Sequence, residues 1–403
     1  MVSPTPIGLL WELGLIIVVA TVFNFIARRL KQPPLVGYIV AGIVMSPYFL
    51  ELLNRYSHID LTFLHVTNIA NITMLSQLGV AFLLFSVGIE SDFLKLKNFG
   101  RLAILGGSLQ VALTALFTFL LCNWFAVLSF HEALYLSVIL SFSSTMIVVK
   151  LLSDSFTIDT VHGRIMLGFL LVQDVLVILL MPVLGNLTLL TNIGVFANFV
   201  ILGGGLIAFA LILSKFLYPK IFSRSIKNPE VLFLGSLSIC FAFMFLAESI
   251  GIPMAIGAFI AGLSLSMLPY SFEIYDEIRG VRDFFVTIFF VTLGMQFNLF
   301  QLSGNLNILL ISFAVVFLVK PTIFYILCIL AGYGKEISLM VALGLSQVSE
   351  FSFLLAGQGL SAKVLSQSFY STTIFVIGLS MVITPYFFRY RACLLYTSPS
   401  PRD

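Results

Sequence analysis

The feature that most constrains this chain is an apolar run from Gly163 to Gly185 with a carboxylate at its centre. About 20 apolar residues suffice for a helix to cross the hydrocarbon of a bilayer. Gln173 and Asp174 lie near the midpoint of this run, as deep as a carboxylate can be. A charge at that depth is costly and normally faces a cavity or a partner. We predict that Asp174 lies on an ion or proton route; the alternative is a structural carboxylate paired with a base.

The composition extends this prediction to the whole chain. Of the 403 residues, 60% are hydrophobic and only 10% are charged, whereas an average globular chain is ~25% charged. The four cysteines and four histidines have no metal-ligand or redox spacing, so we expect neither a metal nor a cofactor. We predict a polytopic all-α membrane protein, and neither an enzyme nor a nucleic-acid-binding protein.

Apolar runs predict thirteen transmembrane helices, and no linker is long enough to hold a soluble domain. The membrane domain is expected over residues 1–390. Residues 391–403 change composition abruptly, and we interpret them as a tail that is a candidate for non-native sequence. No cytosolic regulatory domain is expected. The predicted helices cover residues 8–28, 33–48, 73–90, 101–126, 132–152, 163–185, 193–218, 230–249, 252–268, 282–298, 305–332, 337–357 and 367–389.

The basic residues predict the orientation of the chain in the membrane. With the N-terminus outside, most of the 21 Lys and Arg residues fall at cytoplasmic helix ends, as the positive-inside rule requires. Arg55 and Lys363 fall outside, and Lys320 lies within the helix predicted at 305–332. We therefore predict a multi-pass protein of the plasma (inner) membrane with its C-terminus in the cytoplasm.

The sequence also repeats itself. The third and tenth predicted helices align with Gly88 on Gly294. The copies are seven helices apart, so the second enters the membrane from the opposite side. This predicts inverted-topology repeats of helices 1–6 and 8–13, an architecture common in secondary transporters. The second and ninth helices share a register at an offset of 220: Pro33, Gly37, Ala41 and Gly42 match Pro253, Gly257, Ala261 and Gly262.

The fifth and twelfth predicted helices, which the repeat pairs, each carry a polar run at mid-membrane. The first run contains Ser143, Ser144 and Thr145, and the second contains Ser349 and Glu350. We predict that both helices are broken there and cross, which directs backbone groups and half-helix dipoles toward a site. The alternative for each run is ordinary hydrogen bonding of hydroxyl groups to their own helix.

Three ionisable residues are predicted to lie deep in the membrane: Asp174, Lys320 and Glu350. A single carboxylate can hold a proton or a monovalent cation but not both, and this competition is sufficient for electroneutral exchange. Gln173 can offer a carbonyl oxygen to a partly dehydrated cation, and the nearby hydroxyl groups can offer more. Since a buried charge needs a partner, Lys320 is expected to pair with Asp174 or with Glu350 as a supporting residue.

Five short motifs stand out along the chain: Pro34–Tyr38, Phe85–Glu90, Ser143–Thr145, Leu171–Asp174 and Ser349–Phe351. Together they resemble the cation:proton antiporter-2 family, and most closely its Kef-type potassium efflux branch. The resemblance covers about residues 8–390, and Lys320 stands where the family has a lysine in helix 11. The family usually has glycines where Val348 and Ser349 stand, and Kef-type proteins usually continue into a cytosolic nucleotide-binding domain.

The resemblance implies a sodium/proton-antiporter-like fold and a homodimer. Helices 1–3 and 8–10 would form the dimer part, and helices 4–6 and 11–13 a mobile core that moves like an elevator. In this family the Asp of the Gln-Asp pair carries the cation and the proton, which assigns both to Asp174. Because electrogenic relatives have two adjacent aspartates, Gln173 favours one-for-one exchange.

The sequence leaves K⁺ and Na⁺ open as substrates, and it leaves three other functions to weigh. A gated cation channel would need a filter of carbonyls or charged rings, and the sequence has no TVGYG-like segment. An organic-anion/sodium symporter on the same fold would prefer a basic or polar pocket to the acid at Asp174. A non-transporting sensor is disfavoured by the presence of Asp174, Lys320 and Glu350 together.

Overall fold

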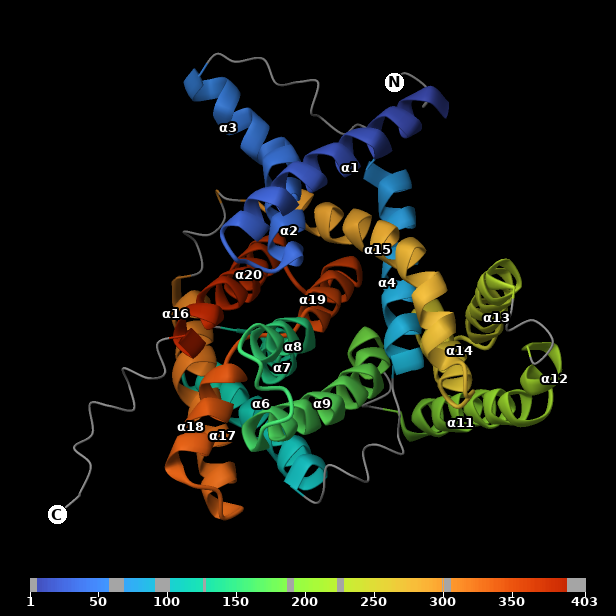
Figure 1. Cartoon of the computed structure of the whole chain (residues 1–403). Coiled ribbons are helices and arrows are strands. Elements are labelled where there is room, and N and C mark those ends of the chain that lie inside the picture. Colours follow the sequence, from blue (N-terminus) through green and yellow to red (C-terminus); the bar gives the residue numbers. More distant parts are fainter. Residues whose placement is uncertain are drawn as a thin grey trace. The chain divides into compact units, whose positions relative to one another are not determined.

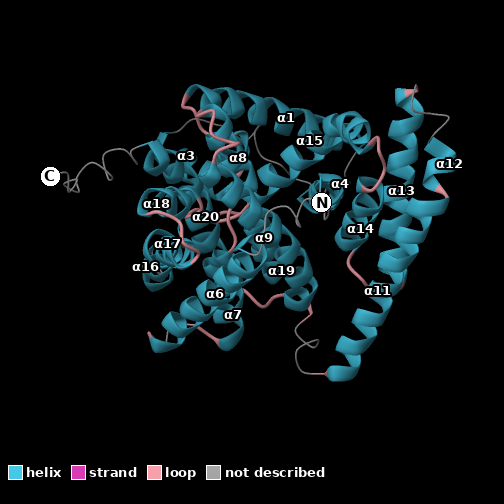
Figure 2. Ribbon diagram, turned by 60° about the horizontal axis from the view of Figure 1, so that its bottom comes forward, coloured by secondary structure: helices cyan, strands magenta, loops and turns pink. Residues whose placement is uncertain are grey.

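The chain is helical throughout the part that the structure describes. Figure 2 shows no strand among these residues. Helices are favoured because they satisfy their own backbone hydrogen bonds in a medium without water. This computed structural model describes residues 6–57, 69–90, 102–125, 128–186, 192–222, 228–298, 300 and 306–389.

Figure 1 labels most of the helices of the described ranges. Two of these helices, α6 and α17, follow directly on the π-helical turns η3 and η5. In chain order the elements are α1 (Pro6–Arg29), α2 (Pro34–Met45), α3 (Pro47–Ser57), α4 (Ile69–Glu90), η3 (Leu102–Gly106), α6 (Gly107–Trp124), α7 (Phe130–Ser141), α8 (Thr145–Asp154), α9 (Val161–Gly185), α11 (Ile193–Phe216), α12 (Tyr218–Phe222), α13 (Pro229–Ser249), α14 (Met254–Ser266), α15 (Ser271–Met295), α16 (Leu306–Ala314), η5 (Val315–Val319), α17 (Lys320–Leu330), α18 (Lys335–Gly344), α19 (Phe351–Ser361) and α20 (Gln367–Arg389).

In the described part of the chain, eight helical segments are long and apolar enough to cross a membrane. The bent pair of α2 and α3, whose axes differ by 61°, makes nine if it is one span. The eight segments coincide within a few residues with the first, fourth to eighth, eleventh and thirteenth helices predicted from the sequence. They confirm a polytopic all-α membrane protein.

The start predicted for the tenth helix, at residue 282, is wrong. α15 begins at Ser271 instead. Its first turns are amphipathic, with Ile274 and Ile278 buried and Glu273 and Glu277 exposed. A search for apolar runs does not detect such turns, because only one face of the helix is apolar.

The chain divides into two compact units, and the first contains Met1–Thr21, Phe63–Leu94 and Asn186–Gly294. In this unit α14 packs against α4, α11 and α13 (Figure 1). A Cβ atom at Gly262 would lie 2.1 Å from the carbonyl oxygen of Phe85. α4 and α14 therefore touch backbone to backbone, a separation that a small residue at the interface allows.

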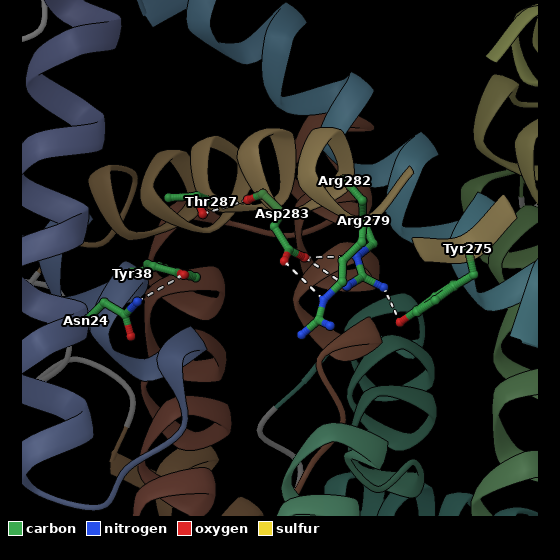
Figure 3. Close-up of polar contacts among 7 residues, drawn as sticks. All are labelled: Asn24, Tyr38, Tyr275, Arg279, Arg282, Asp283 and Thr287. Carbon is green, nitrogen blue, oxygen red and sulfur yellow. Dashed lines mark hydrogen bonds and ion pairs between the residues drawn. The ribbon is translucent and has the colours of Figure 1, made fainter. Parts of the chain in front are cut away.

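A polar cluster in the first unit lies on α15. The guanidinium of Arg282 donates to the hydroxyl of Tyr275 and lies 2.9 Å from the carboxylate of Asp283 (Figure 3). The guanidinium also lies 4.9 Å from the centre of the Tyr275 ring. These contacts link the amphipathic turns of α15 to its apolar part.

The second unit contains Val22–Thr62, Lys95–Gly185 and Met295–Asp403. Its apolar core joins α8, α9, α17, α18 and α20, with the rings of Phe169 and Phe324 meeting edge to face. In the same unit the amide of Asn24 donates to the hydroxyl of Tyr38, between α1 and α2 (Figure 3). α9 packs against α6, α8, α18 and α19, so the helix that carries Asp174 is held on several sides.

Candidate ion-binding site

The first polar run interrupts a helix where the sequence predicts it. α7 ends at Ser141, and α8 begins at Thr145 after two extended residues, Phe142 and Ser144, with Ser143 between them. The hydroxyl of Ser144 caps α8 by accepting the backbone N–H of its third residue, at 3.4 Å. The hydroxyl-rich sequence thus provides the cap that the second half-helix needs.

The second polar run interrupts another helix, since residues 345–350 separate α18 from α19. The hydroxyl of Ser349 accepts the N–H of Phe351 at 3.2 Å, and the N–H of Val348 donates to the hydroxyl of Ser380 on α20 at 3.1 Å. The break therefore forms without the glycines that the resembled family usually has here. Side-chain hydroxyl groups satisfy the backbone groups that the break leaves open.

The two breaks are bonded to each other. Peptide groups outside a helix need partners in a medium without water, and here each break supplies partners for the other. This joins the four half-helices α7, α8, α18 and α19 into one crossing. Three hydrogen bonds make the connection: Ser349 N–H to the Phe142 carbonyl (3.1 Å), Ser143 hydroxyl to the Leu345 carbonyl (2.8 Å) and Gln347 Nε2 to the Ser144 carbonyl (3.3 Å).

Lys320 is fully buried at the start of α17 and donates from Nζ to the carbonyl oxygens of Phe142, at 2.6 Å, and Gln347, at 2.8 Å. The Phe142 carbonyl lies at the C-terminal end of α7, where the helix dipole places partial negative charge. The sequence predicted a pair with Asp174 or Glu350, whereas Nζ contacts these two carbonyl groups. The positive charge of the ammonium group thus compensates the partial negative charge of the carbonyl groups at the two breaks.

Asp174 and Gln173 lie on α9 and meet the first break from its side. The hydroxyl of Thr145 donates to Asp174 Oδ2 at 3.0 Å, and the Asp174 side chain is half-buried. Gln173 is buried; its Oε1 accepts the backbone N–H of Ser143 at 2.8 Å, and its Nε2 donates to Gln110 Oε1 at 2.6 Å. Asp174 is therefore the most exposed of the three deep charged residues, since Lys320 and Glu350 are buried. Its contact with Thr145 places it at the N-terminal end of α8.

Glu350 is 3% exposed, and its carboxyl group interacts with the hydroxyl of Ser144 and the backbone of Met146. It is also the residue that precedes α19. The carboxyl group therefore lies at the N-terminal ends of α8 and α19, where helix dipoles favour negative charge. Within the described part of the chain, Glu350 Oε2 and Gln347 Oε1 are buried without a hydrogen-bond donor.

The structure brings the predicted residues together in the second unit, but two contributors were missed. Gln110 and Thr114 are fully buried on α6, and Gln110 Nε2 donates to Thr114 Oγ1 at 3.0 Å and to the Ser141 carbonyl at 3.1 Å. Two polar residues four apart on an apolar helix share one face, which is the signal that could have found them. The predicted residues that meet here are Ser143, Ser144, Thr145, Gln173, Asp174, Lys320, Ser349 and Glu350.

An all-helical membrane protein with two interlocked helix breaks and a half-buried carboxylate beside them has the features of a secondary transporter. A family model described as "Sodium/hydrogen exchanger, transmembrane" matches residues 14–389. The chain belongs to this family, whose members are antiporters rather than enzymes. This match, together with relatives named K⁺ efflux antiporter and cation/proton antiporter, supports the resemblance to the cation:proton antiporter-2 family and its Kef-type branch.

Individual relatives agree with this assignment. The chain is 30% identical to K⁺ efflux antiporter 5 of Arabidopsis thaliana, over 94% of this chain and 66% of the relative. It is 26% identical to a Na⁺/H⁺ antiporter of Enterococcus hirae, over 96% and 98% of the two chains. The chain spans only 63–66% of the length of the first four curated relatives it matches.

A solved structure shows the same fold. The sodium proton antiporter MjNhaP1 from Methanocaldococcus jannaschii matches with a TM-score of 0.68, covering 96% of this chain and 99% of that one. The two sequences are 18% identical. The sodium/proton-antiporter-like fold expected from the sequence is therefore confirmed at the level of overall architecture.

Proposed function

We propose that this protein exchanges a monovalent cation for a proton across a membrane, with Asp174 as the carboxylate that binds both in turn. The observation that carries this proposal is the position of Asp174. Its carboxylate is half-buried beside Thr145, at the first residue of α8 and next to the crossing. Lys320 and Glu350 are buried and engaged by the crossing itself, so they support the site.

The surroundings of Asp174 suit competition between a proton and a cation. The N-terminal end of α8 favours the ionised carboxylate, which is the form that binds a cation. The hydroxyl oxygen of Thr145 lies within hydrogen-bond distance of that carboxylate and can share the cation. Gln173 uses one lone pair of its amide oxygen for the Ser143 N–H, and the second lone pair is its contribution to the cation.

The exchange is electroneutral in this proposal, with one cation moving against one proton. Gln173 cannot ionise, and Lys320 donates to two carbonyl oxygens whether or not Asp174 is occupied. Only Asp174 then changes its occupant during a cycle. The carrier has the same charge when it bears a proton as when it bears a cation.

We further propose thirteen membrane helices in inverted repeats of helices 1–6 and 8–13, with the N-terminus outside, in the plasma (inner) membrane. Two equivalent contacts support the repeat. A Cβ atom at Gly37 would lie 2.8 Å from the Phe23 carbonyl oxygen, and one at Gly257 would lie 2.4 Å from that of Phe243. Both residues of the second contact are 220 positions after those of the first. The π-helical turns η3 and η5 also fall in helices that the repeat pairs.

An elevator-type cycle of a homodimer completes the proposal. Helices 1–3 and 8–10 form the dimer part, and helices 4–6 and 11–13 form the mobile core. The hydrogen bonds between the two breaks support this division, because they require helices 5 and 12 to move together. K⁺ and Na⁺ both remain substrates of the proposal, since relatives are named for each.

The test is reconstitution of the purified chain in liposomes that contain a pH-sensitive dye. A pulse of K⁺ or Na⁺ is expected to release protons from liposomes with an acidic lumen, with no response in protein-free liposomes. A current of cations without proton movement would indicate a channel instead. Na⁺-driven uptake of an organic anion without a pH change would indicate a symporter on the same fold.

A further inference from the structure

Behind Asp174 runs a chain of buried side-chain amides that the proposed exchange does not yet use. Gln110 and Gln173 are 0% and 1% exposed. Gln110 donates from Nε2 to Thr114 Oγ1 and to the Ser141 carbonyl, and its Oε1 accepts from Gln173 Nε2. Gln173 Oε1 in turn accepts the backbone N–H of Ser143. The chain therefore connects the end of α7 to the break through two side chains on other helices.

These contacts admit one orientation of each amide. The Ser141 carbonyl can only accept, so the NH₂ group of Gln110 must face it. The oxygen of Gln110 then faces Gln173, which must present its own NH₂ group in return. Turning Gln173 over would set an oxygen against an oxygen and an NH₂ group against the Ser143 N–H. The oxygen of Gln173 is thus held toward the break beside Asp174.

We propose that Gln110 is a positioning residue that holds the amide oxygen of Gln173 toward the break and thereby sets the cation affinity of the Asp174 site. The inference rests on the proposed function and deepens it. A monovalent cation is bound by oxygen atoms and repelled by the partial positive charge of an NH₂ group. Without the Gln110 oxygen, Gln173 loses one of the two contacts that fix its amide, so its oxygen is held less firmly toward the break although Asp174 is untouched.

Substitutions on α6 isolate this role. Gln110→Leu removes the donor and the acceptor at similar size. Gln110→Glu keeps an acceptor for Gln173 but places a carboxylate against the Ser141 carbonyl. Thr118→Val is the matched control, because Thr118 is fully buried one turn beyond Thr114 and its hydroxyl donates to the Thr114 carbonyl within α6.

The measurement separates cation affinity from turnover in proteoliposomes of the full chain, with K⁺ and Na⁺ each titrated at fixed pH. For Gln110→Leu the half-saturating cation concentration is expected to rise at least about fivefold, with the maximal rate within about twofold of wild type. At a fixed subsaturating cation concentration the activity profile should move to higher pH, since a weaker cation competes only when protons are scarcer. Thr118→Val should match wild type in all three quantities.

The outcomes are distinguishable. If Gln110→Leu lowers the maximal rate and leaves the half-saturating concentration and pH profile unchanged, Gln110 only packs, and the proposal is overturned. If Gln110→Leu does not fold, the same readouts on Gln110→Met decide, because methionine also lacks the oxygen that accepts from Gln173. An unchanged affinity in Gln110→Met overturns the proposal. If the wild-type protein exchanges neither K⁺ nor Na⁺ for protons, the proposed function is wrong, and the role inferred for Gln110 is wrong with it.

Discussion

The ammonium of Lys320 lies 2.6 Å from the carbonyl oxygen of Phe142, a residue 178 positions earlier in the chain. The same nitrogen reaches the carbonyl of Gln347 at 2.8 Å, so one side chain bonds to both breaks of the crossing. Hydrogen bonds from a charged donor are stronger than those between neutral groups. The lysine therefore holds two interrupted helices together, and its charge compensates their carbonyl ends.

Replacing Lys320 by alanine should destabilise the protein and slow the exchange. The change leaves two buried carbonyl groups without their charged donor, which should cost roughly 2–5 kcal/mol in the free energy of unfolding. The measurement is the melting temperature in detergent, with Lys335→Ala as the control, because Lys335 is exposed at the start of α18. A melting temperature equal to that of wild type would contradict the role assigned to Lys320.

Asp174→Asn should abolish cation-driven proton flux while the protein still inserts and folds. Asparagine keeps an oxygen that can accept the hydrogen bond from Thr145, but it can neither release a proton nor balance a cation. The control is Asp154→Asn, since Asp154 is an exposed acid at the end of α8. Residual flux in Asp174→Asn above that of protein-free liposomes would falsify the proposed mechanism.

Glu350→Gln should retain exchange at a reduced rate, because Glu350 is proposed as a support residue and not as a carrier. Glutamine keeps an oxygen acceptor beside the Ser144 hydroxyl and the Met146 backbone, with which the carboxyl group interacts. Glu350→Leu removes that acceptor at the ends of two helices and should lower the melting temperature as well. Loss of all flux in a well-folded Glu350→Gln protein would make Glu350 a second carrier.

The exchange rate should be independent of membrane potential. With one cation moving against one proton, no net charge crosses in a cycle. If Lys320 released its own proton when the cation bound, one charge would move per cycle, worth ~2.3 kcal/mol per 100 mV. Initial rates in liposomes clamped with valinomycin test this for Na⁺, and a lipophilic-ion clamp tests it for K⁺. A steep voltage dependence would rule out the single-carboxylate account.

The sequence predicts where helices lie and where two of them break, because hydropathy and hydroxyl-rich runs are local properties. It does not predict what the freed groups bind. Lys320 was expected to meet a carboxylate, since formal charges are visible in a sequence, whereas the partial charge on the Phe142 carbonyl exists only once α7 has ended there. The contacts of a buried charge are therefore set by where helices stop.

The contacts of neutral polar residues are a second feature that the sequence does not predict. Gln173 was expected to offer its oxygen freely to a cation, and in the structure that oxygen already accepts the Ser143 N–H. Gln110 was passed over, because it carries no charge and its spacing of four residues from Thr114 is a weak signal in an apolar helix. Its importance depends on the facing side chain of Gln173, which is 63 residues away in the chain.

The crossing also has a consequence for how the chain is made. The hydrogen bond from Ser143 to Leu345 joins residues 202 positions apart, and that from Ser352 to Ile139 joins residues 213 apart. Synthesis proceeds from the N-terminus, so the first break leaves the ribosome long before its partners exist. Its open peptide groups are costly in hydrocarbon until α17, α18 and α19 have been inserted. A nascent chain stalled before α17 would thus contain the whole of α9 with Asp174 and still lack a closed site.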